Sequence, residues 1–134
     1  MGKTYQWRSV QTNFRVEPGA YIEKTIDLHY TGDRIMLWGS WSSSGGNGTE
    51  WLTPNGGTIN VMIVDDNNYL LWLNGEKFDA LYNVQWSWHD YNIIVLIDRP
   101  TGVLYHLVFS NIGSSYQKRL QAGFNLFWYN VPTL

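Results

Sequence analysis

Short runs of β-branched and aromatic residues recur along this chain, and turn residues separate them. In Thr58–Val64 the apolar side chains alternate, so that Ile59, Val61 and Ile63 share one face of an extended segment. No long segment carries apolar residues at the i, i+3, i+4 and i+7 spacing of an amphipathic helix. The pattern predicts about eight or nine strands, roughly ten residues apart, without helices between them.

Turn residues mark where the expected strands end. Pro18-Gly19 and Asn74-Gly75, for example, favour tight reversals. The expected strands are Tyr5–Val10, Ile22–Tyr30, Arg34–Trp41, Thr58–Val64, Tyr69–Leu73, Lys77–Tyr82, Trp86–Ile97, Val103–Phe109 and Gly123–Tyr129.

Three further segments bear on the architecture. Ile93–Ile97 is an unbroken apolar run, which is typical of a central strand covered on both faces. Ser42–Gly57 is rich in Ser, Gly and Asn and is interpreted as a long loop, and Asp65–Asn68 as a polar turn. Together these features predict an all-β fold: a single antiparallel β-sandwich, jelly-roll-like, forming one domain over residues 1–134.

Composition narrows the classes of partner. The 134 residues include no cysteine, which excludes a disulfide framework, a thiol nucleophile and a thiolate zinc site. The net charge is −2, so nucleic acid is not an expected partner. No apolar run approaches the roughly 20 residues of a membrane-spanning helix. The first residues lack the apolar stretch of a signal peptide, which leaves the cytoplasm and non-classical export both open.

Motifs of catalysis are missing from the sequence. It has no nucleophile elbow, no phosphate-binding Gly-rich loop and no His-Glu-x-x-His motif. The histidines, His29, His89 and His106, are far apart along the chain. Asp65–Asn68 offers oxygen ligands for calcium but lacks the spacing of a calcium loop, so a weak calcium site there stays open. We therefore expect neither an enzyme nor a cofactor.

Tryptophan is the most distinctive residue type. Eight tryptophans are more than a sandwich core of 134 residues easily holds. Trp86 and Trp88 lie two residues apart, so a continuous strand would point both to one side. Trp41 and Trp51 border or lie within the polar loop, where we expect them to be exposed. The tryptophans expected in the core are Trp7, Trp38 and Trp72, of which Trp38 and Trp72 stand next to leucine.

Exposed indoles beside small hydrogen-bonding groups suit a sugar ligand. The C–H face of a pyranose packs on an aromatic ring, while its hydroxyls need directional polar partners, and aromatic side chains lose little conformational freedom on binding. We therefore predict a non-catalytic carbohydrate-binding protein, a lectin or carbohydrate-binding module, whose partner is a glycan or glycoconjugate. The predicted ligand-binding residues are Trp41, Trp51, Trp86 and Trp88 for stacking, and His29, Arg34, Asn47 and Glu50 for the hydroxyls.

An alternative from a different class stays open. The chain could be an oligomeric attachment or protein-interaction domain, such as a viral or phage fibre head. Its surplus aromatic residues would then be buried between identical subunits, because interface cores are enriched in Trp and Tyr.

Several segments resemble the galectins, which are β-sandwiches of about this size. They are Ile26–Tyr30, Arg34, Asn47–Trp51 and Thr58–Leu73. The resemblance implies β-galactoside binding through His29, Arg34, Glu50 and Trp51. The family's His-x-Asn-x-Arg motif is replaced here by the longer segment from His29 to Arg34, and its Trp-Gly-x-Glu-x-Arg motif has no counterpart.

A second set of segments resembles the actinoporin-like sandwiches, which include fungal fruit-body lectins and pore-forming toxins. These segments are Gln11–Phe14, Ile22–Thr25 and Tyr82–Tyr91. The toxins insert an N-terminal amphipathic helix, whereas Tyr5–Val10 is expected to be a strand, which disfavours pore formation. Both resemblances imply a sandwich that binds without catalysis.

Overall fold

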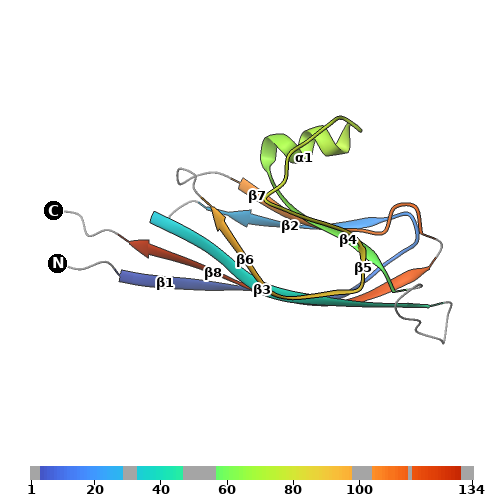
Figure 1. The fold of residues 1–134 in the computed structure, drawn as a ribbon, viewed down its shortest axis with the longest axis horizontal. Helices are drawn as coiled ribbons and strands as arrows, with labels where there is room; N and C mark the ends of the chain where they lie inside the picture. Colours follow the sequence, from blue (N-terminus) through green and yellow to red (C-terminus); the bar gives the residue numbers. More distant parts are fainter. Residues whose placement is uncertain (1–3, 29–32, 47–56, 98–103, 115, 131–134) are drawn as a thin grey trace.

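The chain folds into two packed β-sheets with one short helix, as shown by a computed structural model that describes residues 4–28, 33–46, 57–97, 104–114 and 116–130 (Figure 1). The predicted all-β antiparallel sandwich of about eight strands is therefore confirmed. The elements are β1 (Thr4–Val16), β2 (Tyr21–Asp27), β3 (Asp33–Gly46), β4 (Ile59–Asp65), α1 (Asp66–Leu73), β5 (Tyr82–Ser87), β6 (His89–Ile97), β7 (Leu104–Ser110) and β8 (Gln117–Asn130).

The strand order is that of a jelly roll. One sheet has the order β1-β8-β3-β6 and the other the order β2-β7-β4-β5. Strands β1 to β4 pair antiparallel with β8, β7, β6 and β5 respectively, as if one long hairpin were rolled up. Two more pairs, β3 with β8 and β4 with β7, complete the sheets. This is how an eight-stranded jelly roll forms two sheets from one ribbon.

Alternate residues of each strand fill the space between the sheets. Leu37 of β3, Leu107 and Phe109 of β7 and Phe124 of β8 are all buried there. The packing is tightest at Gly39 of β3, where an added Cβ would lie 2.3 Å from the carbonyl oxygen of Gly123 and 2.5 Å from the ring of Phe124. Only glycine fits at this position, because any side chain would collide with backbone and core together.

Helix α1 replaces the predicted strand Tyr69–Leu73, so the expectation of a sandwich without helices is wrong. The predicted polar turn is in fact the start of this helix: Asp65 is its N-cap, and its carboxylate accepts a hydrogen bond of 2.8 Å from the backbone N–H of Asn68. The reversal expected at Asn74-Gly75 ends the helix, with Gly75 at a φ of 72°.

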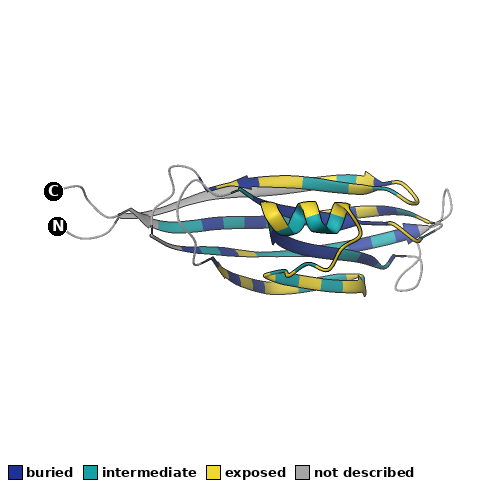
Figure 2. Ribbon diagram, turned by 90° about the horizontal axis from the view of Figure 1, so that it is seen from above, coloured by how far each residue is buried: buried dark blue, intermediate teal, exposed yellow. Residues whose placement is uncertain are grey.

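The helix covers the outer face of the β2-β7-β4-β5 sheet. Tyr69 and Trp72 pack on a second apolar cluster formed by Met62, Val64 and Val108. Figure 2 shows the helix, exposed and intermediate along its length, lying above largely buried strands. Trp72 was expected in the main core, but it belongs to α1 and its half-buried side chain packs between the helix and the sheet.

Strand boundaries in the middle of the chain differ from the prediction. Ser42 to Gly46 continue β3, so this part of the predicted loop is strand, and residues 47–56 lie outside the described residues. Residues 77–81 form no strand. The predicted strand Trp86–Ile97 is interrupted at Trp88, where the chain crosses from β5 in one sheet to β6 in the other.

Strand β6 lies at the edge of its sheet, not in the centre. Among the described strands it pairs with β3 alone. Its unbroken apolar run suggested burial on both faces, but only Ile93, Val95 and Ile97 face the core. Ile94 and Leu96 point outward and are 61% and 71% exposed. The prediction failed because nothing in the described chain covers this outer face.

Candidate functional site

The outer face of the β1-β8-β3-β6 sheet carries the candidate site. Strand register places its outward side chains in rows that cross the sheet. Each row holds neighbours from adjacent strands. In order along the sheet, the rows are Phe127 with Met36 and Leu96, Asn125 with Trp38 and Ile94, Gly123 with Ser40, Asn13 with Gln121 and Ser42, and Arg15 with Arg119 and Ser44. The face therefore changes from apolar, through neutral polar, to cationic.

A groove crosses the neutral middle of this face. One hollow of about 570 Å³ is lined by Asn13, Ser42 and Gln121 among others. A second hollow, of about 340 Å³, is lined by Trp38 and Asn125 among others. Both hollows share Ser40, Tyr91 and Gly123, so they form one continuous depression, which we call the sheet groove.

Two aromatic side chains stand exposed in the sheet groove. Trp38 is 45% and Tyr91 58% exposed. Tyr91 and Asn92 lie in a bulge where β6 has one residue more than β3, and Asn92 has a φ of 59° there. Beyond Tyr91, the ring of His89 stacks on it at 5.0 Å, and Trp88 meets His89 edge-on at 4.0 Å. The result is an aromatic row along the border of the groove.

Trp41 lies beneath the groove instead of in an exposed loop. It is only 1% exposed, so the prediction that it is exposed is wrong. Because β3 continues to Gly46, Trp41 takes an inward position on that strand. Its indole N–H donates to the hydroxyl of Tyr82 at 3.1 Å, and that hydroxyl donates to Asp90 at 2.5 Å. Burial, and then the bond to Asp90, raises the pKa of Tyr82. This chain of bonds links the two sheets under the groove floor.

The exposure of the other described tryptophans also differs in part from the prediction. Trp38 was expected in the core but is exposed, because it occupies an outward position of β3. Trp86 and Trp88, whose exposure was left open, are 45% and 40% exposed. They do not belong to one continuous strand, since β5 ends at Ser87 between them. The side chain of Trp7 lies outside the described part of the chain.

Trp86 is held in an unusual backbone conformation. Its φ is 50°, which is rare for a bulky residue. Its N–H donates to the side-chain oxygen of Asn60 at 2.7 Å. Its ring also lies over Gly113, where an added Cβ would come within 3.7 Å of it. Neither of these two neighbours lines the sheet groove, and Trp86 does not line it either.

Half of the predicted site residues lie outside the described residues, namely His29, Asn47, Glu50 and Trp51. Arg34 belongs to β3 by its backbone, and its side chain also lies outside the described part. The sequence-based reasoning missed Trp38, Tyr91, Asn13 and Gln121. Trp38, Ser40 and Ser42 stand at alternate positions, and a strand extended past Trp41 would have put all three on the same outward face.

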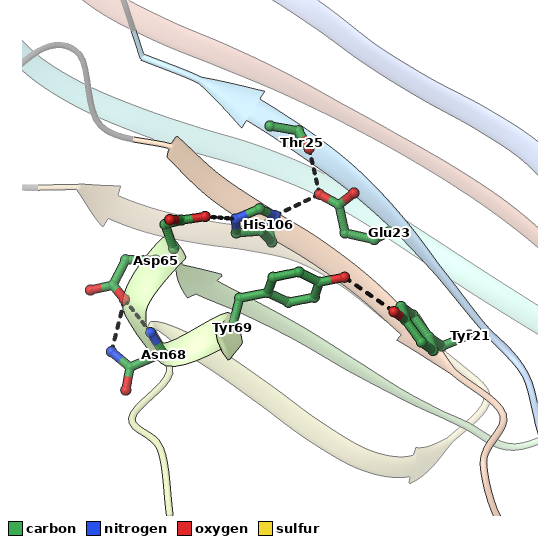
Figure 3. A network of polar contacts seen from close by, with 8 residues as sticks. Tyr21, Glu23, Thr25, Asp65, Asn68, Tyr69 and His106 are labelled. Carbon is green, nitrogen blue, oxygen red and sulfur yellow. Dashed lines mark hydrogen bonds and ion pairs between the residues drawn. The ribbon is translucent and has the colours of Figure 1, made fainter. Parts of the chain in front are cut away.

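The opposite sheet holds a polar cluster beneath the helix (Figure 3). His106 lies 2.7 Å from Glu23 through Nδ1 and 2.8 Å from Asp66 through Nε2. Tyr69 stacks on the imidazole at 4.2 Å, and Thr25 donates to Glu23 at 2.6 Å. Since an ionised carboxylate only accepts, the imidazolium form donates both bonds. Both nitrogens are engaged and the ring is buried, so the cluster ties α1 to β2 and β7 and offers no open base.

The described residues show neither a candidate metal centre nor a membrane-spanning helix. They contain no group of three or more His, Cys, Asp or Glu side chains that could hold a metal ion. At Asp65–Asn68, one carboxylate oxygen of Asp65 accepts hydrogen bonds from both the backbone N–H and the side-chain amide of Asn68. No described helix is long and apolar enough to cross a membrane. Comparison with protein-family models and with curated proteins finds no match to this sequence.

Proposed function

We propose that this jelly roll binds carbohydrate, without catalysing a reaction, through the sheet groove. The observation that carries the proposal is the position of Trp38 and Tyr91, which stand exposed in a depression lined for the rest mainly by neutral polar side chains and by small residues. Carbohydrates combine apolar C–H faces with many hydroxyls, so they need both kinds of surface at once.

Each part of the groove matches one part of a sugar. Trp38 and Tyr91 offer flat rings on which a pyranose can stack. Asn13, Gln121 and Asn125 offer amides that both donate and accept, which suits hydroxyl groups. Gly123 has no side chain, and the space above it is open. All of these residues lie on paired strands, which hold them more rigidly than loops would.

The test is a glycan array followed by titration calorimetry on single variants. We expect Trp38→Ala and Tyr91→Ala each to weaken glycan affinity about tenfold or more, as buried aromatic contacts usually do. Tyr116→Ala is the matched control, since Tyr116 is exposed but does not line the groove. Wild-type protein that binds no glycan, or groove variants that bind like the control, would refute the proposal.

Trp86→Ala separates the sheet groove from the site predicted from sequence. Trp86 does not line the groove, so its replacement should leave affinity unchanged. A loss of affinity with Trp86→Ala, and not with Trp38→Ala, would move the sugar site to the corner between β5 and β6.

One observation favours a second candidate function, a protein-interaction or attachment domain. The apolar end of the outer face exposes Trp38, Ile94 and Leu96 together. Exposed patches of this kind commonly mark protein interfaces, and an apolar edge strand can pair with another chain. Sedimentation over a range of concentrations tests this function. A stable oligomer that Leu96→Lys dissociates would support it, whereas a monomer at all concentrations would contradict self-association.

A further inference from the structure

Two arginines stand side by side at one end of the sheet groove. Arg15 of β1 and Arg119 of β8 are direct register partners, and both are exposed. They face outward, like Asn13 and Gln121, which form the preceding row. Like charges directly opposite each other destabilise an antiparallel pair. The register therefore places two positive side chains together on this face.

The arginine pair is within reach of a ligand in the groove. One row of outward residues follows the next at about 7 Å, two residues of an extended strand. An arginine side chain is long enough to lean over the neighbouring row, where Asn13 and Gln121 line the groove. A ligand lying along the strands would thus have the rings of Trp38 and Tyr91 toward one end and two guanidinium groups at the other.

Both guanidinium groups keep their own positive charge, because arginine is not deprotonated in proteins. Glu17, two residues beyond Arg15 on the chain, accepts a hydrogen bond from Gln117. The proposal does not require the arginines to be without internal contacts, because each guanidinium has five N–H donors and one partner uses only some of them.

We infer that the glycan bound in the groove carries an anionic group, a carboxylate or a sulfate ester, which Arg15 and Arg119 bind together. This inference rests on the proposed carbohydrate-binding function. Planar guanidinium groups bind carboxylate and sulfate-like oxyanions through paired hydrogen bonds, and such charge-assisted bonds are stronger than neutral ones. The neutral part of the groove then binds the sugar rings, and the arginine pair binds the charged substituent.

The experiment uses an array of matched glycans, in which each neutral oligosaccharide is printed beside congeners with one carboxylate or one sulfate. Wild-type protein should bind the anionic members at least tenfold more tightly than their neutral counterparts, and added salt should reduce this preference. The double variant Arg15→Gln/Arg119→Gln should lose the preference while retaining the affinity for neutral members. The carboxylated and sulfated arms show which group is preferred.

The control is Lys77→Gln, which removes one exposed positive charge at a residue that does not line the sheet groove. It should keep the preference for anionic glycans. Equal binding of neutral and anionic members by the wild type, or an unchanged preference in the double variant, would overturn the inference and leave the proposed function intact. Binding of no glycan at all would overturn both. An unfolding midpoint no lower than that of the wild type confirms that the double variant is folded.

Discussion

The two outer faces of this jelly roll are built from similar apolar residues but meet different surroundings. On the β2-β7-β4-β5 sheet, Val64 and Val108 are fully buried beneath α1. On the β1-β8-β3-β6 sheet, Ile94 and Leu96 occupy equivalent outward positions and are mostly exposed. The difference lies in the insertion of α1 between β4 and β5, which covers one sheet only. An apolar outer face is therefore either a second core or a surface available to a partner.

Polar residues on the two faces differ in the same way. Under α1, His106 has both nitrogens engaged by Glu23 and Asp66, so it serves the fold. No described element covers the outer face of the β1-β8-β3-β6 sheet, which we call the bare face, and there Asn13 and Gln121 line an open groove. A polar side chain whose donors are satisfied within the fold stabilises it, whereas a set of them around a hollow with exposed rings can serve a ligand. This contrast is why we propose the bare face as the binding surface.

The largest expected effect comes from placing the same charge on each face. Val108→Asp puts a carboxylate under the helix with no described partner, which should cost more than about 4 kcal/mol and leave the protein largely unfolded. Ile94→Asp puts it in solvent, where the lower strand propensity of Asp costs about 1 kcal/mol. Urea unfolding followed by circular dichroism measures both.

The same pair of variants can break the comparison. If Ile94→Asp destabilises as strongly as Val108→Asp, the bare face is covered in solution, and the stability of the wild type should then depend on protein concentration. The contrast between a covered and an uncovered face would then be wrong.

An intermediate loss of stability is expected when the hydrogen bonds that connect α1 to its sheet through His106 are removed. His106→Gln can keep one of the two bonds to Glu23 and Asp66 and loses the ring stacked on Tyr69. We expect a loss of about 2 kcal/mol, typical of a hydrogen bond to a charged group. Hydrogen exchange should accelerate in the amides of α1, while glycan affinity of the bare face stays unchanged. Unchanged exchange in α1 would show that apolar packing alone holds the helix.

Local patterns predicted much of the fold because they report local preferences. The alternation in Thr58–Val64 gave β4, and the jelly-roll sandwich followed from the number and spacing of such segments. Helix α1 was not predicted, because its eight residues are too few to show a clear helical periodicity of apolar side chains and because it has no buried residue. Its cap, Asp65, looks in sequence like any polar turn.

The site was harder to predict because exposure depends on which elements lie above a strand. The run Ile93–Ile97 reads the same in a central and in an edge strand, and only the topology places β6 at the edge. Trp38 and Trp41 lie three positions apart on β3, and Trp38 points outward whereas Trp41 points inward. That direction follows only once β3 is known to continue past Ser42. Arg15 and Arg119 are brought together by a register that no local pattern contains.

The smallest expected effect concerns the link between the sheets at Tyr82. Tyr82→Phe removes the hydroxyl that accepts from Trp41 and donates to Asp90, which should cost about 1 kcal/mol near neutral pH. Burial raises the pKa of Tyr82 above its ordinary value of 10.0. The folded state therefore holds this proton more tightly than the unfolded state, so the stability contributed by the hydroxyl is complete below pH 10 and is lost as the pH rises further.

Urea unfolding of the two proteins at neutral pH and at several values above pH 10 tests this sign. The wild-type advantage over Tyr82→Phe should shrink with rising pH, because only the wild type gains free energy by ionising Tyr82 on unfolding. A gap that stays constant would mean that the hydroxyl ionises equally well in both states, as an exposed phenol would. Tyr82 would then be open to solvent, and the floor of the sheet groove would be less closed than its bonds to Trp41 and Asp90 indicate.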